Sequence, residues 1–162
     1  MGPSHWSFFD ARKLNRRQRG MVSCMGTHHV NDPETIRRLL STPGRWAVVG
    51  LTNNPVRVAP SIARFLRDEL SMKIFPVSLS GETVMGEPGF TKLADIPEPI
   101  DVVDCFVNSS KVGDIVDQAI AVGAKAVWLQ LGVIDEAAAQ RARDAGLDVV
   151  MDTCPKIEYP FR

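Results

Sequence analysis

Polar and basic residues follow a short apolar run, and their order suits the binding of an anion. The run Trp46–Val49 has no polar alternation, which is typical of a buried strand. Gly50, a polar turn at 52–55 and Arg57 come next, and a helix is expected directly after them. The first backbone N–H groups of a helix are unpaired and lie at the positive end of its dipole. This segment therefore predicts a phosphate-binding turn.

The turn lacks the two common glycine motifs for nucleotides. A dinucleotide site normally has G-x-G-x-x-G after its first strand, and this turn contains only Gly50. No Gly-Lys-Ser/Thr triplet follows the strand, so there is no Walker loop. Asn53 and Asn54 can supply left-handed conformations and side-chain hydrogen bonds in place of glycines. NAD, FAD and ATP hydrolysis are therefore less favoured than another phosphate-containing ligand.

Cys154 is the residue with the greatest potential for covalent chemistry. Pro155 and Lys156 follow it, and a nearby ammonium group favours the nucleophilic thiolate form of a cysteine. No base is spaced to serve it, so we expect no catalytic residue. A redox-active thiol and an inert thiol are the two interpretations that remain open.

Other reactive side chains do not form a constellation. Cys105 lies inside a predicted strand and is expected in the core, as is Trp128. The cysteines have no C-x-x-C spacing, and the adjacent His28-His29 pair cannot face one ligand together, so no metal site is predicted. Asp101 and Asp104 lie three apart on a strand and hence on opposite faces, which argues against an acid–base pair.

The elements that must position these residues alternate regularly. Strands are predicted at 46–50, 73–77, 102–107, 126–131 and 147–151, and helices at 33–40, 62–68, 112–122 and 136–145. Such alternation requires a mostly parallel sheet with helices on both faces. We therefore expect an α/β, three-layer, Rossmann-like fold with five strands. Pro76 indicates either that its strand lies at an edge of the sheet or that the strand ends near this residue.

The ligand of such a sheet lies beyond the carboxyl ends of the strands, where the strand order reverses. Four segments meet this condition. The candidate surface comprises Gly50 to Arg57, Val77 to Ser80, Phe106 to Lys111 and Gln130 to Gly132.

The composition predicts one soluble domain. The chain has 162 residues, of which 44% are hydrophobic, and a formal net charge of zero, so it can bury a core and has no field that would attract nucleic acid. No apolar run approaches the ~18 residues of a membrane span, and the first twenty residues lack the apolar core of a secretory signal. We expect a cytoplasmic protein.

The first residues differ from the rest in charge. Residues 1–24 carry five basic side chains against Asp10 alone. We interpret 1–30 as a disordered basic extension and 31–162 as the domain, with a transit peptide and a nucleic-acid-binding arm as alternatives for the extension.

Four segments together strongly resemble the small stand-alone CoA-binding proteins, which are Rossmann-like relatives of the CoA-binding domain of the succinyl-CoA synthetase α subunit. They are Trp46–Pro55, Asp101–Asp104, Ala124–Gly132 and Val150–Glu158, in order and with matching spacing over residues 32–160. The resemblance implies a protein that binds coenzyme A or an acyl-CoA without evident catalysis of its own. It implies a monomer or homodimer, with an acyl-CoA enzyme as a possible partner and neither nucleic acid nor a membrane.

The resemblance also implies the ligand-binding residues. The turn 51–54 would wrap the phosphate end of CoA, Arg57 would pair with a phosphate, 106–108 would line the nucleotide end, and 129–131 would lie along the ligand. Cys154 would then be placed to form a mixed disulfide with the CoA thiol. The full implied set is Gly50, Leu51, Thr52, Asn53, Asn54, Arg57, Ser61, Val77, Ser78, Phe106, Val107, Asn108, Leu129, Gln130 and Leu131.

The chain departs from the family pattern at two places. Relatives usually have a serine where this chain has Ala59, so that hydroxyl is missing here, although Ser61 stands two residues on. Residues 77–80 read Val-Ser-Leu-Ser, where relatives commonly have Val-Asn-Pro and a basic residue. No cation for the CoA 3′-phosphate is evident there. An NAD- or nucleotide-binding protein is therefore one alternative. A non-catalytic remnant or subunit of an acyl-CoA ligase is another, since that chemistry needs a phosphorylatable histidine and none follows His29.

Overall fold

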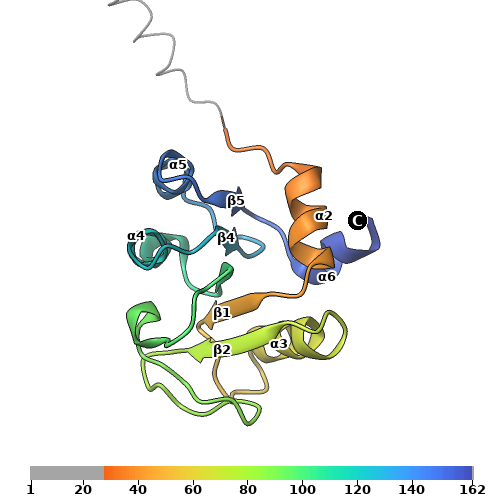
Figure 1. The fold of residues 1–162 in the computed structure, drawn as a ribbon, viewed down its shortest axis with the longest axis vertical. Helices are drawn as coiled ribbons and strands as arrows, with labels where there is room; N and C mark the ends of the chain where they lie inside the picture. The colour runs from red at the N-terminus through yellow and green to blue at the C-terminus, as the bar shows by residue number, and fades with distance from the viewer. Residues whose placement is uncertain (1–27, 162) are drawn as a thin grey trace, which may run out of the picture.

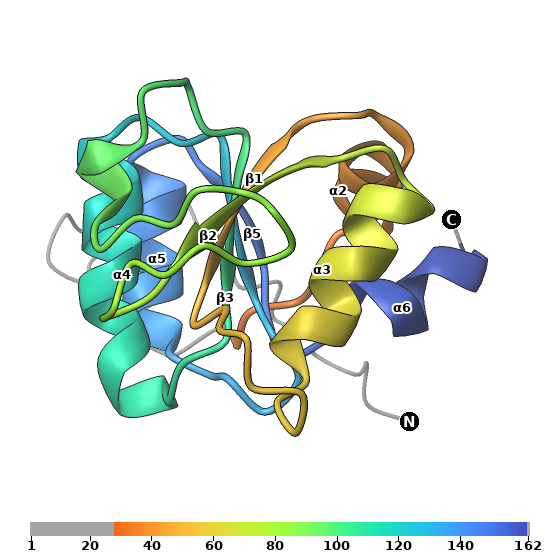
Figure 2. The ribbon, with the colours of Figure 1, turned by 90° about the horizontal axis from the view of Figure 1, so that it is seen from below.

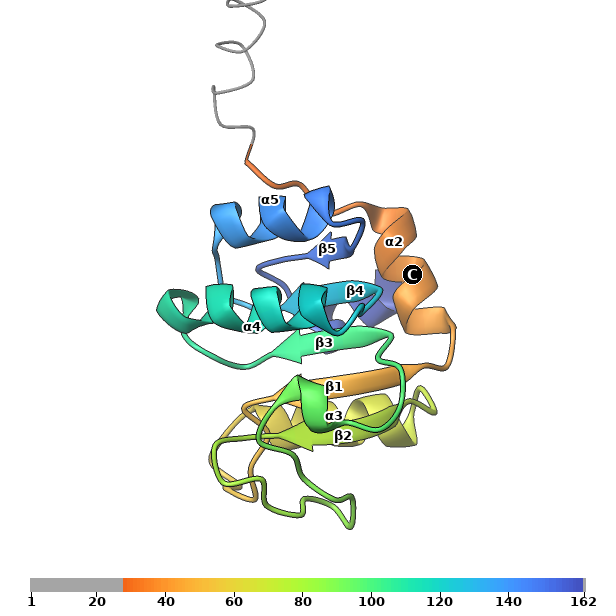
Figure 3. The same ribbon diagram turned by 60° about the vertical axis from the view of Figure 1, so that its left-hand side comes forward.

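The computed structural model describes residues 28–161, which form a five-stranded parallel sheet in the order β2-β1-β3-β4-β5 (Figure 1). Figure 3 shows the strand arrows pointing the same way. The predicted α/β, three-layer, Rossmann-like fold is confirmed, and β2, which contains Pro76, is an edge strand as expected. The strands are β1 (Arg45–Val49), β2 (Lys73–Val77), β3 (Val102–Cys105), β4 (Ala126–Leu129) and β5 (Asp148–Val150).

Helices cover both faces of the sheet (Figure 2). One face carries α2 (Pro33–Ser41), α3 (Ala59–Asp68) and α6 (Pro155–Glu158), and the other carries α4 (Ser109–Ala121) and α5 (Glu136–Asp144). Two 3-10 turns, η2 (Leu93–Asp95) and η3 (Tyr159–Phe161), complete the described elements. None of the helices in residues 28–161 is long and apolar enough to cross a membrane.

Local signals explain where the helices start. The Asp32 carboxylate accepts hydrogen bonds from two backbone N–H groups of α2, and Pro33 occupies the first turn. The Asp135 carboxylate caps α5 by accepting a hydrogen bond from the Ala138 N–H at 2.9 Å. The segment before α2 is also held, because the Asn31 side chain bonds the backbone N–H and carbonyl of Met151. Residues 1–27 of the predicted extension 1–30 lie outside the described residues.

Successive side chains along each strand point to opposite faces of the sheet and contribute to two hydrophobic cores. One lies under α4 and α5, and the other lies under α2, α3 and α6. Trp128 is fully buried in the second core and donates its indole N–H to the Thr153 carbonyl at 3.0 Å, and Cys105 is fully buried in the first. Both predictions that these residues belong to the core are confirmed.

The boundaries differ from the predictions at the carboxyl ends. The third strand ends at Cys105 rather than at 107, and the fourth ends at Leu129 rather than at 131. The apolar runs continue past these ends because Phe106, Val107 and Leu131 line cavities instead of the sheet. Helix α6 was not predicted from the sequence, since four residues are too few to show periodicity.

Candidate functional site

The strand order reverses between β1 and β3, and the chain leaves both strands at one crevice. The Gly50 N–H donates to the Val77 carbonyl at 2.8 Å, and the Phe106 N–H donates to the Val49 carbonyl at 2.9 Å. Gly50 has φ +92°, and a Cβ built on it would lie 2.5 Å from the Phe106 carbonyl oxygen. Glycine is therefore required where the two strand ends approach each other most closely.

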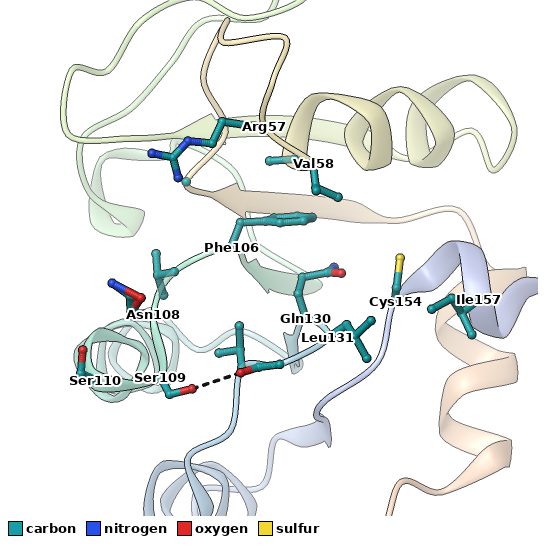
Figure 4. Close-up of a pocket in the computed structure, with 15 residues that line it drawn as sticks. Arg57, Val58, Phe106, Asn108, Ser109, Ser110, Gln130, Leu131, Cys154 and Ile157 are labelled. Carbon is teal, nitrogen blue, oxygen red and sulfur yellow. Dashed lines mark hydrogen bonds between the residues drawn. The ribbon is translucent and has the colours of Figure 1, made fainter.

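A cavity of about 810 Å³ opens on the β4 side of this crevice (Figure 4). We call it the Cys154 cavity. Its walls come from the start of α3, the start of α4, the loop after β4 and the helix α6. It is lined by Gly50, Arg57, Val58, Ala59, Phe106, Val107, Asn108, Ser109, Ser110, Gln130, Leu131, Gly132, Val133, Cys154 and Ile157.

A second cavity of about 710 Å³ lies toward β2, and we call it the Lys111 cavity. It shares Gly50, Arg57, Phe106 and Val107 with the Cys154 cavity, so the two meet at the crevice. Its other lining residues are Val49, Thr52, Asn54, Val77, Ser78, Leu79, Ser80, Thr91, Leu93, Lys111, Asp114, Ile115 and Gln118.

The crevice suits an anion. Among the described residues that line the two cavities, the cations are Arg57 and Lys111 and the only acid is Asp114. Neither α3 nor α4 has a side-chain cap at its N-terminus, and the first residues of both helices line the Cys154 cavity. Uncapped helix N-termini beside a guanidinium group favour phosphate.

Gln130 lines the Cys154 cavity, and a buried acid accepts a hydrogen bond from its side chain. Its amide nitrogen donates to Asp104 Oδ1 at 2.5 Å. Asp104 is fully buried, and its Oδ2 has no hydrogen-bond partner. Burial raises the pKa of Asp104 to about 7, although the hydrogen bond from Gln130 opposes the shift. With its nitrogen engaged, Gln130 has its carbonyl oxygen left to accept a hydrogen bond from a ligand.

The structure brings most of the residues implied by the resemblance into one of the two cavities. Those that line a cavity are Gly50, Thr52, Asn54, Arg57, Val77, Ser78, Phe106, Val107, Asn108, Gln130 and Leu131, together with Cys154. Figure 4 places Arg57 and Cys154 on opposite sides of the Cys154 cavity.

Four predicted residues do not line either cavity. The side chains of Leu51 and Leu129 are fully buried in the core. The Asn53 amide donates to Glu82 Oε2 at 2.7 Å and to the Thr83 carbonyl at 2.9 Å, so it ties the turn to the loop after β2. The Ser61 hydroxyl accepts from Lys156 Nζ at 2.8 Å, which links α3 to α6. These residues support the walls of the site.

Comparison with known proteins identifies the family. Residues 44–160 match the sequence profile of a family described as a CoA binding domain. The chain belongs to the CoA binding domain family. The resemblance predicted from the sequence is thereby confirmed.

Relatives of this CoA binding domain protein occur in bacteria and archaea. It is 29% identical over 124 residues to "Uncharacterized protein YneT" of Bacillus subtilis (strain 168), covering 76% of this chain and 91% of that protein. It is 31% identical to a solved hypothetical protein from Pyrococcus horikoshii OT3, with a TM-score of 0.76, covering 84% of this chain and 98% of that one.

A larger enzyme contains a similar unit. The dinucleotide forming acetyl-coenzyme A synthetase 1 of Ca. Korarchaeum cryptofilum is 25% identical, with a TM-score of 0.63. The match covers 72% of this chain and 28% of the synthetase. The CoA binding domain protein is therefore similar to one part of that enzyme.

Three residues of the site received no individual role in the sequence analysis. Lys111 lies inside the predicted candidate surface, but nothing in its neighbours marked it as a cation that shares a cavity with 77–80. Asp104 could be noticed as an acid within an apolar strand, which is a signal of function in its own right. Ile157 belongs to the short α6 and had no signal at all.

Proposed function

We propose that this CoA binding domain protein binds one molecule of coenzyme A across both cavities. The nucleotide end would lie in the Lys111 cavity, and the pantetheine arm and thiol would lie in the Cys154 cavity. The observation that carries the proposal is the position of Arg57, whose side chain lines both cavities where they meet. Coenzyme A has its diphosphate between two long arms, so a cation where two cavities meet suits its layout and charge.

Lys111 supports the same orientation. The segment 77–80 lacks the basic residue that the family pattern has there, yet Lys111 of α4 lines the same cavity as Ser78 and Ser80. We propose that Lys111 takes over the contact with the 3′-phosphate of the ligand, and that the two serine hydroxyls add hydrogen bonds. A 3′-phosphate distinguishes CoA from NAD, so this contact also favours CoA over the dinucleotide alternative.

Cys154 lies at the end of the site where the thiol of the ligand would be. The redox thiol and the mixed disulfide suggested by the sequence stay predictions. The cytoplasmic location and the proposed partner enzyme likewise stay predictions.

Replacing Arg57 with alanine is expected to weaken CoA binding strongly. One charge-assisted hydrogen bond contributes about 1.5–3 kcal/mol, so the dissociation constant should rise about ten- to a hundredfold. Isothermal titration of CoA into the full-length protein measures this effect. Arg64→Ala on α3 is the matched control, because Arg64 is exposed and lines neither cavity. Equal losses in both variants, or none in Arg57→Ala, would contradict the proposal.

Replacing Lys111 with alanine is expected to act only through the 3′-phosphate. CoA affinity should fall about tenfold, whereas the affinity for dephospho-CoA, which lacks this phosphate, should change less than about twofold. Titration of both ligands into the wild type, Lys111→Ala and Lys92→Ala tests this. Lys92 is exposed and lines neither cavity, so its variant should behave as the wild type does. A similar loss for both ligands would remove Lys111 from the 3′-phosphate site.

A further inference from the structure

Large apolar side chains are exposed around the Cys154 cavity. Val58 is 64% exposed, Leu131 is 63% exposed and Ile157 is 49% exposed, and all three line this cavity. They come from three separate segments: the N-cap of α3, the loop after β4, and α6. Exposed apolar residues that converge on one cavity indicate a surface that a ligand covers.

The cavity has a polar side and an apolar side. Arg57, Asn108 and Ser110 lie together on one side in Figure 4, and Cys154, Leu131 and Ile157 lie on the other. Among the described residues that line the Cys154 cavity, Arg57 is the only charged one. The site is therefore built for a ligand with an anionic part and an uncharged, apolar part.

A cation near the apolar end is already engaged. Lys156 precedes Ile157 in α6, but its ammonium group donates to Ser61 Oγ at 2.8 Å and lies 5.8 Å from the centre of the Phe65 ring. Lys156 does not line the cavity. An acyl group that ends in a carboxylate would thus find no charged partner there, and burying its charge would be unfavourable.

We propose that the Cys154 end of this cavity binds an uncharged aliphatic acyl chain, with the thioester near Cys154 and the chain lying over Leu131 and Ile157. The protein would then prefer medium-chain acyl-CoA to free CoA and to acyl-CoA with a terminal carboxylate. The inference rests on the proposed function, because the CoA part must occupy the same site. Covering these side chains removes apolar surface of both chain and protein from water.

The test compares four ligands by isothermal titration into the full-length protein under reducing conditions: CoA, acetyl-CoA, succinyl-CoA and octanoyl-CoA. Burial contributes about 0.8 kcal/mol per fully buried methylene, so partial burial of the octanoyl chain should raise affinity about tenfold or more over CoA. Acetyl-CoA should resemble CoA, and succinyl-CoA should bind no more tightly than CoA.

A matched pair of variants locates the effect. Ile157→Ser should reduce the ratio of octanoyl-CoA affinity to CoA affinity at least about threefold, because the chain loses an apolar partner. Ile134→Ser should keep the ratio, since Ile134 is 48% exposed, nearly as much as Ile157, but does not line the cavity.

The outcomes separate the two proposals. CoA binding without any gain from the octanoyl chain would overturn the acyl site and leave the CoA site intact, and it would fit an apolar end that contacts another protein chain instead. A gain that Ile134→Ser and Ile157→Ser reduce equally would also overturn it, as would a preference for succinyl-CoA. Failure of all four ligands to bind the folded protein would overturn the proposed function and this inference with it.

Discussion

Replacing Gly50 with alanine is expected to destabilise the protein by about 2–4 kcal/mol and to weaken CoA binding at least about tenfold. The backbone of Gly50 has φ +92°, which L side chains adopt only at a cost. The added Cβ would also lie 2.5 Å from the Phe106 carbonyl oxygen. The ends of β1 and β3 would have to separate, and this is the point where the two cavities meet. Urea unfolding and titration of CoA measure the two effects.

Gly146→Ala separates the backbone strain from the clash. Gly146 has φ +87°, but a Cβ there meets nothing within 4 Å. Its variant should lose only about 1 kcal/mol of unfolding free energy and keep its CoA affinity. If Gly50→Ala behaved like Gly146→Ala in both measurements, the close approach of Gly50 to Phe106 would have no role in shaping the site.

Replacing Asp104 with asparagine is expected to stabilise the protein above pH 7. Burial raises the pKa of Asp104 from its ordinary 3.8 to about 7. Between these values the folded protein holds a proton that the unfolded chain has lost, so stability falls as the pH rises from about 4 through 7. The shift corresponds to a free energy on the order of 4 kcal/mol, which Asp104→Asn should recover at pH 8 and not at pH 4. Urea unfolding of both proteins across this pH range measures it.

Asp101→Asn is the control of opposite sign. Although burial acts against it, hydrogen bonds from Arg45 and Lys125 hold the pKa of Asp101 below its ordinary value. Its contribution to stability is therefore present at neutral pH and is lost as the pH falls through the folded-state pKa. Asp101→Asn should destabilise the protein at pH 8. An Asp104→Asn variant that is no more stable than the wild type at pH 8 would show that Asp104 ionises in the folded protein without cost.

The Asp104→Asn substitution is also expected to weaken ligand binding at the site. Above about pH 7 Asp104 is ionised and can only accept, so it holds the Gln130 amide with its nitrogen turned inward. Asparagine can donate or accept and would hold Gln130 in neither orientation. At pH 8, CoA affinity measured by isothermal titration should therefore fall a few-fold while stability rises, as is common when a buried polar group is kept for function.

Many features of the fold could be predicted because they depend on neighbours within a few residues. The apolar runs of the five strands and their alternation with helices were visible in the sequence, and the capping residues Asp32 and Asp135 stand directly before the helices predicted at 33–40 and 136–145. The turn at 50–57 could be assigned to an anion for the same reason, since a strand, a turn and a helix start follow one another along the chain. Strand ends were less certain, because an apolar residue past the end of a strand can line a cavity as Phe106 does.

The tertiary structure decides which side chains of a predicted segment point toward the ligand site and which point into the core. Leu51 and Leu129 belong to segments that the resemblance assigns to the ligand, yet both point into the core. Ser61 lies near the start of α3, but its hydroxyl accepts a hydrogen bond from Lys156 of α6. A segment can be predicted from its local pattern, whereas which of its side chains face the ligand depends on what packs against it.

The sequence by itself determined the class of fold and the resemblance to CoA-binding proteins, and it led to the prediction of a phosphate-binding turn, because each depends on local periodicity and local spacing. Only the tertiary structure placed Lys111 and Ser78 in one cavity, placed Ile157 and Leu131 in the other, and joined Gln130 to Asp104. These partners are far apart in the chain and meet because the sheet has the order β2-β1-β3-β4-β5. Strand order arises from the packing of the whole core, and no short stretch of sequence encodes it.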